Sequence, residues 1–238
     1  MTQAPVRDWA RVVQPPGRGD DFVFWAFRTG FGMCLRAGFR MRREGPQPPA
    51  GPCVFAANHS SFLDPLLLGA MVPRRLVYLM TEVVWRSRGL GWFYRWNRAI
   101  PLSARGGNRE ALRAAREVLR QGRSLGIFPE GGLSRDGLPM LGSPGAVSIV
   151  LQEHVPIVPV GIVGAHDAFP PGATWPRPAR VTVRFGAPIL PRELDALGGG
   201  DRRARLRLAT AHIMRAIAAL TGNVAREDVL AAAGVPMA

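Results

Sequence analysis

One polar stretch between two apolar runs constrains the fold more than any other part of the sequence. Residues 53–57 are apolar and predict a buried strand, and residues 66–71 are apolar and predict the start of a helix. Between them, residues 58–65 read Asn-His-Ser-Ser-Phe-Leu-Asp-Pro. A histidine and an aspartate therefore follow the carboxyl end of a strand, which in open α/β sheets is where ligands bind. The pattern predicts an α/β fold with a candidate site at His59 and Asp64.

His59 and Asp64 form a candidate general-base pair. A neutral imidazole held by a carboxylate can take a proton from a weak nucleophile such as an alcohol. Five residues along a regular helix would separate the two side chains by about 140°, so the chain must turn before the helix begins. The pair also has a purely structural interpretation, because Asp64 before Pro65 is a favourable helix N-cap and His59 would then be an ordinary loop residue. The local spacing leaves both interpretations open.

Strand-like and helix-like segments alternate along the rest of the chain. Apolar runs and periodicity predict strands at residues 76–80, 100–102, 124–128, 155–161 and 180–185, and helices at residues 108–121, 143–154 and 201–220. This order predicts a mixed, mostly parallel central sheet flanked by helices. The prolines in residues 155–161 place that strand at a bulge or near an edge. Polar groups follow three strands, at His59 and Asp64, at Arg105, and at Glu130 with Gly131, and we expect them to converge on one crevice.

The N-terminal segment predicts an amphipathic helix ahead of the sheet. Residues 1–20 are rich in proline, glycine and charge and predict a flexible lead. Residues 22–39 are rich in aromatics, and on a helix continued to residue 43 four arginines fall within an arc of about 120° (Arg28, Arg36, Arg40 and Arg43). Such a helix is typical of an element lying on anionic lipid, and a helix packed on the domain with its arginines in water is the alternative. A proline-rich stretch then predicts a boundary between residues 1–45 and the main domain, 46–238.

The excess of basic over acidic residues limits the classes of partner that the protein is expected to bind. The 238 residues include 31 basic and 17 acidic ones, a formal net charge of +14, and every basic residue is arginine. The lack of lysine excludes a catalytic lysine, a Schiff base and a Walker-type phosphate site in this chain. Because no nucleic-acid-binding motif accompanies the charge, we expect an anionic membrane surface or an acidic ligand as partner and no nucleic acid. Cys34 and Cys53 lie in apolar runs and predict small buried side chains, not a disulfide or metal pair.

Four motifs occur in a fixed order across residues 53–161. They are Asn-His-Ser-Ser-Phe-Leu-Asp at 58–64, a strand ending in Arg105 at 100–105, Phe-Pro-Glu-Gly at 128–131 followed by Ser134, and Pro-Ile-Val-Pro-Val at 156–160. This ordered set resembles the glycerolipid acyltransferases, typified by 1-acyl-glycerol-3-phosphate (lysophosphatidate) acyltransferase. The arginine motif is the looser match, with one residue more than the usual spacing. Each motif alone is degenerate, whereas the ordered set is specific.

The resemblance implies transfer of a fatty acyl group from acyl-CoA or acyl carrier protein to a hydroxyl of a lysolipid in phospholipid biosynthesis. It implies an acyltransferase domain over residues 46–238, working at the cytoplasmic face of a membrane. His59 would deprotonate the acceptor hydroxyl and Asp64 would orient the imidazole. The acceptor and its phosphate would be bound by Arg105, Glu130, Gly131 and Ser134. The thioester is a co-substrate, so no metal and no other cofactor is expected.

One departure from the family pattern concerns the acceptor. Family members commonly have Thr-Arg after Glu-Gly, whereas Gly132 and Leu133 occupy those positions here. Lysophosphatidate is the favoured acceptor, with another lysolipid or hydroxylated lipid as the alternative. A non-catalytic protein that binds anionic membranes is the competing functional class. The sequence contains one Gly-x-Ser-x-Gly match, at residues 122–126, but it lies at the start of the strand predicted at 124–128 and not between a strand and a helix, which argues against a serine hydrolase.

Overall fold

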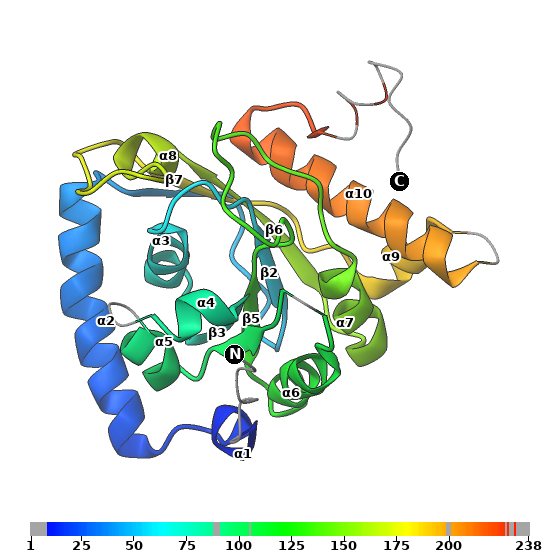
Figure 1. Ribbon diagram of the computed structural model, residues 1–238, viewed down its shortest axis with the longest axis horizontal. Helices are drawn as coiled ribbons and strands as arrows, with labels where there is room; N and C mark the ends of the chain where they lie inside the picture. The colour runs from blue at the N-terminus through cyan, green and yellow to red at the C-terminus, as the bar shows by residue number, and fades with distance from the viewer. Residues whose placement is uncertain are drawn as a thin grey trace, which may run out of the picture.

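The structure, a computed structural model that describes residues 9–87, 91–104, 106–198, 201–226, 228 and 231, is built on a seven-stranded sheet (Figure 1). The order of the strands is β1-β7-β6-β2-β5-β3-β4. Their bounds are β1 (Arg42–Glu44), β2 (Val54–Ala57), β3 (Leu76–Thr81), β4 (Ile100–Leu102), β5 (Ser124–Ile127), β6 (Ile157–Val163) and β7 (Thr182–Phe185). All neighbouring pairs are parallel except β6 with β7. The sheet is mixed and mostly parallel, which confirms the predicted fold class.

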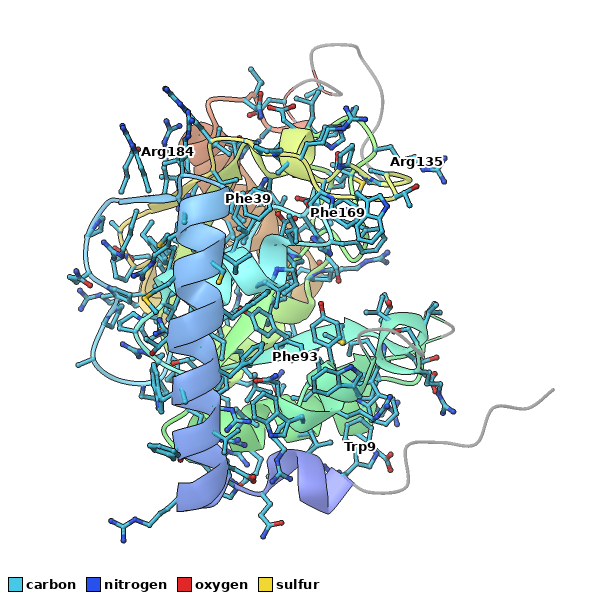
Figure 2. All side chains as sticks on the ribbon, turned by 90° about the vertical axis from the view of Figure 1, so that its left-hand side faces the viewer. Trp9, Phe39, Phe93, Arg135, Phe169 and Arg184 are labelled. Atoms are coloured by element: carbon cyan, nitrogen blue, oxygen red, sulfur yellow. The ribbon has the colours of Figure 1, made fainter. Side chains whose placement is uncertain are left out.

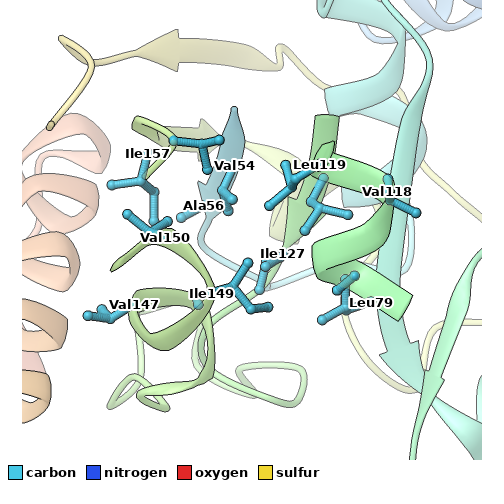
Figure 3. Close-up of a cluster of buried hydrophobic side chains, with 14 of the residues drawn as sticks. Val54, Ala56, Leu79, Val118, Leu119, Ile127, Val147, Ile149, Val150 and Ile157 are labelled. Atoms are coloured by element: carbon cyan, nitrogen blue, oxygen red, sulfur yellow. The ribbon is translucent and has the colours of Figure 1, made fainter. Parts of the chain in front are cut away.

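Helices cover both faces of the sheet (Figure 1). One face carries α1 (Trp9–Val13), α6 (Arg109–Arg120), α7 (Gly145–Glu153), α9 (Pro191–Ala196) and α10 (Arg202–Thr221), and the other carries α2 (Arg18–Gly38), α3 (Asp64–Met71), α4 (Glu82–Trp85), α5 (Gly91–Trp96) and α8 (Ala165–Ala168). Val54 and Ala56 of β2 belong to the apolar core drawn in Figure 3, and Phe55 and Ala57 belong to the core on the opposite face. Because both faces are covered, β2 is an unbroken apolar run rather than an alternating one.

The two strands that carry the main motifs are neighbours in the sheet. β2 pairs in parallel with β5, with Ala56 opposite Ile127, so both strands end at the same edge. The chain leaves β2 into Asn58 and leaves β5 into Phe128. Segments about seventy residues apart in the sequence therefore start side by side, at the edge where α/β sheets bind ligands.

The strand β6 lies inside the sheet, between β7 and β2, so of the two predicted positions, a bulge or near an edge, the edge is not seen. Its Pro159 pairs with Ala56 of β2, and the Pro159 carbonyl accepts a hydrogen bond from the Gly186 amide at 2.9 Å. Gly186 is the first residue beyond the end of β7. The N–H and C=O of a strand residue point to the same neighbouring strand. The N–H that Pro159 lacks would therefore face the end of β7, so its absence removes no hydrogen bond to β2.

The helix α2 is present, but the predicted basic stripe on it is wrong. The helix ends at Gly38, so Arg40, with a positive φ of 42°, and Arg43, in β1, lie beyond it. Arg28 and Arg36 turn toward the domain, Arg28 half-buried and Arg36 still exposed to solvent, so α2 packs on the domain as the alternative expected. Their guanidinium groups donate to backbone carbonyls at the C-terminal end of α3, at 3.1 Å from Arg28 to Gly69, 2.5 Å from Arg28 to Val72 and 3.1 Å from Arg36 to Ala70.

The position of these arginines has a simple physical reason. The last carbonyl groups of a helix have no intrahelical donor, and the helix dipole favours a positive charge beside them. Arg28 and Arg36 supply that charge to α3 and fix α2 against it. The outer face of α2 is left apolar, with Phe22 76% and Met33 59% exposed. Within the described ranges, no helix has both the length and the apolar character that crossing a membrane requires.

The N-terminal region is joined to the domain at two further points. α1 lies within the stretch predicted as a flexible lead, and the Trp9 indole donates to Glu110 of α6 at 2.8 Å. β1 precedes residue 46 and pairs with β7, so the sheet begins before the predicted boundary. The prediction for the cysteines is confirmed for Cys53, which is buried, and wrong for Cys34, which is exposed.

Candidate active site

His59 and Asp64 form a hydrogen-bonded pair. The Nδ1 atom of His59 lies 2.9 Å from Oδ2 of Asp64, whose side chain is fully buried. The same Oδ2 accepts the backbone N–H groups of Ser60 at 2.7 Å and Ser61 at 2.8 Å. The chain turns back between the two residues, as the spacing required. The purely structural interpretation of Asp64 is wrong, because Leu63 is the N-cap residue of α3 and the carboxylate binds amides that precede the helix.

This arrangement assigns the ring nitrogens of His59. A carboxylate oxygen that accepts two backbone N–H groups is an acceptor toward the imidazole as well, so Nδ1 carries the proton of the shared hydrogen bond. Nε2 is then the nitrogen with a free lone pair. The His59 side chain is 18% exposed, while its partner is inaccessible to solvent. The pair therefore has the form of a general base with its orienting carboxylate.

Asn58 anchors the motif to the sheet, a role that sequence reasoning missed. Its side chain donates to the Ile162 carbonyl at 3.0 Å and accepts from the Ile162 amide at 2.7 Å. The side-chain amide of Asn58 thereby extends the hydrogen bonding between β2 and β6 by one residue beyond the end of β2. Next along the chain, the Ser61 hydroxyl donates to the Phe169 carbonyl at 2.8 Å. The position of Asn58 directly after a buried strand was the available signal.

The Phe-Pro-Glu-Gly motif and the loop after it hold the backbone of His59 from both sides. Oε1 of Glu130 accepts the His59 N–H at 3.0 Å, and the Ser134 N–H donates to the His59 carbonyl at 2.8 Å. Of the three strand ends predicted to converge, two are therefore seen together, those that carry His59 with Asp64 and Glu130 with Gly131. Burial raises the pKa of the Glu130 carboxyl to about 7, and hydrogen bonds from the backbone of His59 and Met140 oppose that rise.

The remaining predicted residues differ in how they relate to this centre. Ser134 is buried, and its hydroxyl donates to Asp136 at 2.8 Å, so this proton is used within the loop. Hydrogen bonds from Arg226 and then from Ser134 lower the pKa of Asp136 to about 2. Gly131 has a positive φ of 70°, which glycine adopts without strain. The prediction for Arg105 concerns a residue outside those that the structure describes.

The ring of Phe128 packs on the imidazole, and Tyr78 packs on Phe128. The rings of His59 and Phe128 are stacked with centroids 4.2 Å apart, and the rings of Phe128 and Tyr78 are parallel at 6.3 Å. The Tyr78 hydroxyl donates to the Pro65 carbonyl at 2.7 Å. Sequence reasoning assigned no function to Phe128, although it opens the Phe-Pro-Glu-Gly motif.

A mostly apolar pocket reaches Pro65, the residue that follows Asp64. It lies between α2, α3, β3 and α5, with an empty volume of about 570 Å³ that includes its open mouth. Phe27 and Phe31 of α2 and Phe93 of α5 line it, and Figure 2 shows Phe93 beside α2. Pro65 and Tyr94 line it as well. Burial, together with the charge of Asp64, raises the pKa of Tyr94 to about 12, which is consistent with a tyrosine facing the buried carboxylate.

Comparison with known proteins identifies the family. The model of the family described as Acyltransferase matches residues 39–163, more than half of the chain. The chain belongs to the acyltransferase family. Its matched region includes His59, Asp64 and Glu130, so the site described above lies within the family domain.

Relatives of this acyltransferase carry one recurring name. The chain is 32% identical over 159 residues to a 1-acyl-sn-glycerol-3-phosphate acyltransferase of Limnanthes douglasii, covering 64% of this chain and 55% of the relative. It is 25% identical over 175 residues to a 1-acyl-sn-glycerol-3-phosphate acyltransferase of Bacillus subtilis, covering 73% of this chain and 85% of the relative. The chain thus spans about half the length of the first plant relatives, 55% and 48%.

A solved structure has the same fold. The 1-acyl-sn-glycerophosphate acyltransferase PlsC of Thermotoga maritima superposes with a TM-score of 0.67 at 23% sequence identity, and the match covers 89% of this chain and 86% of that one. The match extends well beyond residues 39–163, so the fold on both sides of the family domain is shared too.

Proposed function

We propose that this acyltransferase moves a fatty acyl group from a thioester to the hydroxyl of a lysolipid. The observation that carries the proposal is the buried Asp64 carboxylate, which accepts two backbone amides and orients His59 at 2.9 Å. The site provides a base that can act on an alcohol. The one Gly-x-Ser-x-Gly match, at residues 122–126, puts Ser124 at the start of β5, where the side chain is buried and accepts from the Cys53 amide, so it is not a nucleophile on a strand-to-helix turn. Direct transfer between two bound substrates fits these residues.

The chemistry follows from the assigned tautomer. Nε2 of His59 takes the proton of the acceptor hydroxyl as its oxygen attacks the thioester carbonyl. Asp64 stabilises the imidazolium that forms. When the tetrahedral intermediate collapses, the carbon–sulfur bond breaks and the imidazolium returns its proton to the leaving thiolate. The products are the acylated lipid and the free thiol, and His59 is neutral again.

The apolar pocket supports a fatty acyl chain as the group transferred. Its lining is mostly apolar, as expected of a site for a hydrocarbon chain. Pro65, which follows Asp64 directly, lines the pocket beside the catalytic pair, so a chain lying in the pocket would bring its carbonyl close to His59. Acyl-CoA and acyl carrier protein both present a thioester and negative charge, and the net charge of +14 suits either donor.

Lysophosphatidate is the acceptor that the names of the relatives support, with another lysolipid as the alternative. We assign the acceptor phosphate to Arg105, with the Gly131 backbone as a further contact. Glu130 and Ser134 contribute by holding the backbone of His59 at the edge of the head-group site. Leu133 occupies the position where the family commonly has arginine, and Arg135, two residues on, is exposed and points outward in Figure 2.

We place this acyltransferase on the cytoplasmic face of a membrane as a peripheral or monotopic protein. α2 covers one wall of the acyl pocket and exposes Phe22 and Met33 on its outer side. An apolar helix face next to an acyl pocket suits contact with the lipid that supplies the acceptor. Arginines elsewhere on a chain of net charge +14 add attraction to anionic head groups.

Thiol release tests the proposal. Purified protein is incubated with acyl-CoA or acyl carrier protein and a panel of lysophosphatidate, lysophosphatidylglycerol, lysophosphatidylcholine and monoacylglycerol, and free thiol is followed by a colorimetric reagent. We expect release that requires an acceptor, that is greatest with lysophosphatidate, and that is lost in His59→Ala. His212→Ala removes an exposed histidine on α10 and is the matched control with wild-type activity. Full activity in His59→Ala contradicts the mechanism, and vesicle binding without turnover favours the non-catalytic alternative.

A further inference from the structure

The imidazole of His59 ends a column of three aromatic rings. Phe128 stacks on it with a centroid distance of 4.2 Å and an interplanar angle of 22°. Tyr78 continues the column on Phe128, at 6.3 Å and 9°. The rings come from three places in the sequence: the strand β3, the residue after β5, and the first motif. We call these three residues the aromatic column.

A glycine in the sheet makes room for the column. Tyr78 of β3 lies opposite Gly126 of β5 in the pairing register. A Cβ atom on Gly126 would lie 2.4 Å from Cε1 and 2.6 Å from Cδ1 of the Tyr78 ring. The ring therefore lies flat across β5, toward Phe128 two residues further on. Any larger residue at position 126 would displace the ring from this place.

Both ends of the column are fixed to the motif that carries the base. The Tyr78 hydroxyl donates to the carbonyl of Pro65, which follows Asp64. At the other end, the carboxylate of Asp64 holds the Nδ1 edge of the imidazole. Asp64 alone leaves the ring of His59 free to swing about the hydrogen bond, whereas a flat ring against its face removes that freedom. The Nε2 lone pair then points in one direction.

We propose that Phe128 is a positioning residue for His59, and that the aromatic column stabilises the imidazolium formed during acyl transfer. An aromatic face carries partial negative charge and attracts a cation placed over it. His59 gains a positive charge only while it holds the proton of the acceptor. The attraction is therefore stronger in the transition state than in the resting enzyme, which is the condition for raising kcat. The inference rests on the proposed function, since it concerns the same base.

Replacing Phe128 distinguishes the effect of its aromatic face on kcat from the effect of its volume. Phe128→Leu keeps an apolar side chain but removes the aromatic face, and we expect kcat to fall roughly 2- to 30-fold, with KM for donor and acceptor unchanged. Phe128→Tyr keeps the ring and should restore kcat. Phe185→Leu, which removes a buried ring elsewhere in the sheet, controls for loss of packing and should lower the melting temperature without lowering kcat. Unchanged kcat in Phe128→Leu, or equal losses in Phe128→Leu and Phe128→Tyr, overturns the proposal.

A spectroscopic measurement tests the geometry without turnover. The chain has 4 histidines, so protein labelled with carbon-13 at the histidine Cε1 gives a small set of signals, and His59→Ala identifies the one of His59. The ring current of Phe128 should shift this signal upfield in the wild type and in Phe128→Tyr, and the shift should be lost in Phe128→Leu. A signal that does not move in Phe128→Leu refutes the column. If the wild type transfers no acyl group, the proposed function fails, and this spectrum still decides the geometry.

Discussion

Asp64→Asn isolates the charge of the orienting carboxylate from its hydrogen bonds. In the wild type, Oδ2 of Asp64 accepts from His59, Ser60 and Ser61, and Oδ1 is buried with no hydrogen-bond partner in the described part of the chain. An asparagine can place its amide oxygen at the position of Oδ2, because only an acceptor suits the two backbone N–H groups. The amide nitrogen then takes the unpartnered position of Oδ1. The tautomer of His59 is kept, and the negative charge is lost.

The magnitude follows from the spacing. Two unit charges about 4 Å apart interact by about 4 kcal/mol at an effective dielectric constant of about 20. The transition state loses this attraction in Asp64→Asn, so kcat should fall by roughly 10³-fold. The free energy of unfolding should change by only about 1 kcal/mol, since the two backbone hydrogen bonds remain. Asp64→Ala leaves the amides of Ser60 and Ser61 unpaired in a buried site and should cost roughly 1–3 kcal/mol for each.

Thiol release and urea denaturation, measured on both variants, check this reasoning. We expect Asp64→Asn to be inactive but stable, and Asp64→Ala to be both inactive and destabilised. If Asp64→Asn kept more than about a tenth of the wild-type kcat, the buried charge would not stabilise the imidazolium as argued. If Asp64→Asn were as unstable as Asp64→Ala, the backbone amides would not be held by the substituted side chain, and the assigned geometry would be wrong.

Three further predictions follow from other contacts. The folded pKa of Glu130, about 7, lies above its ordinary value of 4.5, so stability is lost as pH rises through that interval, by about 1.4 kcal/mol per pH unit at most. In Glu130→Gln, urea denaturation at pH 5 and pH 7 should show this contribution removed, and an unchanged slope would contradict the burial argument. Arg28→Met removes the donors to Gly69 and Val72 and should lower the free energy of unfolding by about 2 kcal/mol, whereas the exposed Arg135→Ala should leave it unchanged in the same measurement. Phe22→Ser should weaken sedimentation with anionic vesicles roughly tenfold at an unchanged melting temperature, and equal binding would remove α2 from the proposed membrane contact.

Most of the fold and the centre of the site could be predicted from the sequence. Apolar runs located the strands because parallel strands covered on both faces must be apolar throughout, as β2 is. The motifs brought His59 and Glu130 together because parallel neighbours such as β2 and β5 end at one edge. The spacing of His59 and Asp64 required a turn, and the turn is present. The pattern of residues within one element was sufficient for a correct prediction wherever that element alone determined the structure.

The predictions failed where a partner from elsewhere in the chain decided the outcome. Periodicity showed that Arg28 and Arg36 share a face of α2, but nothing in it revealed that the carbonyls of α3 would lie opposite. The strand with Pro159 was predicted at a bulge or near an edge, because its own sequence could not show that β7 ends opposite the N–H that proline lacks. The stacking of Phe128 on His59 likewise joins two strand ends, and composition cannot show which face of a ring meets another.

The helix α3 bears on the proposed membrane contact, because it links the reacting centre to α2. Its first residue, Asp64, holds the base, and the carbonyls at its other end are bound by Arg28 of α2. At about 1.5 Å per residue, its 8 residues act as a rigid spacer of about 12 Å between the reacting centre and the helix that we propose meets the lipid. The depth of the base relative to the head groups is thus fixed by the length of one short helix. One added residue in α3 would turn its two ends by about 100° relative to each other and misalign the enzyme with the lipid interface.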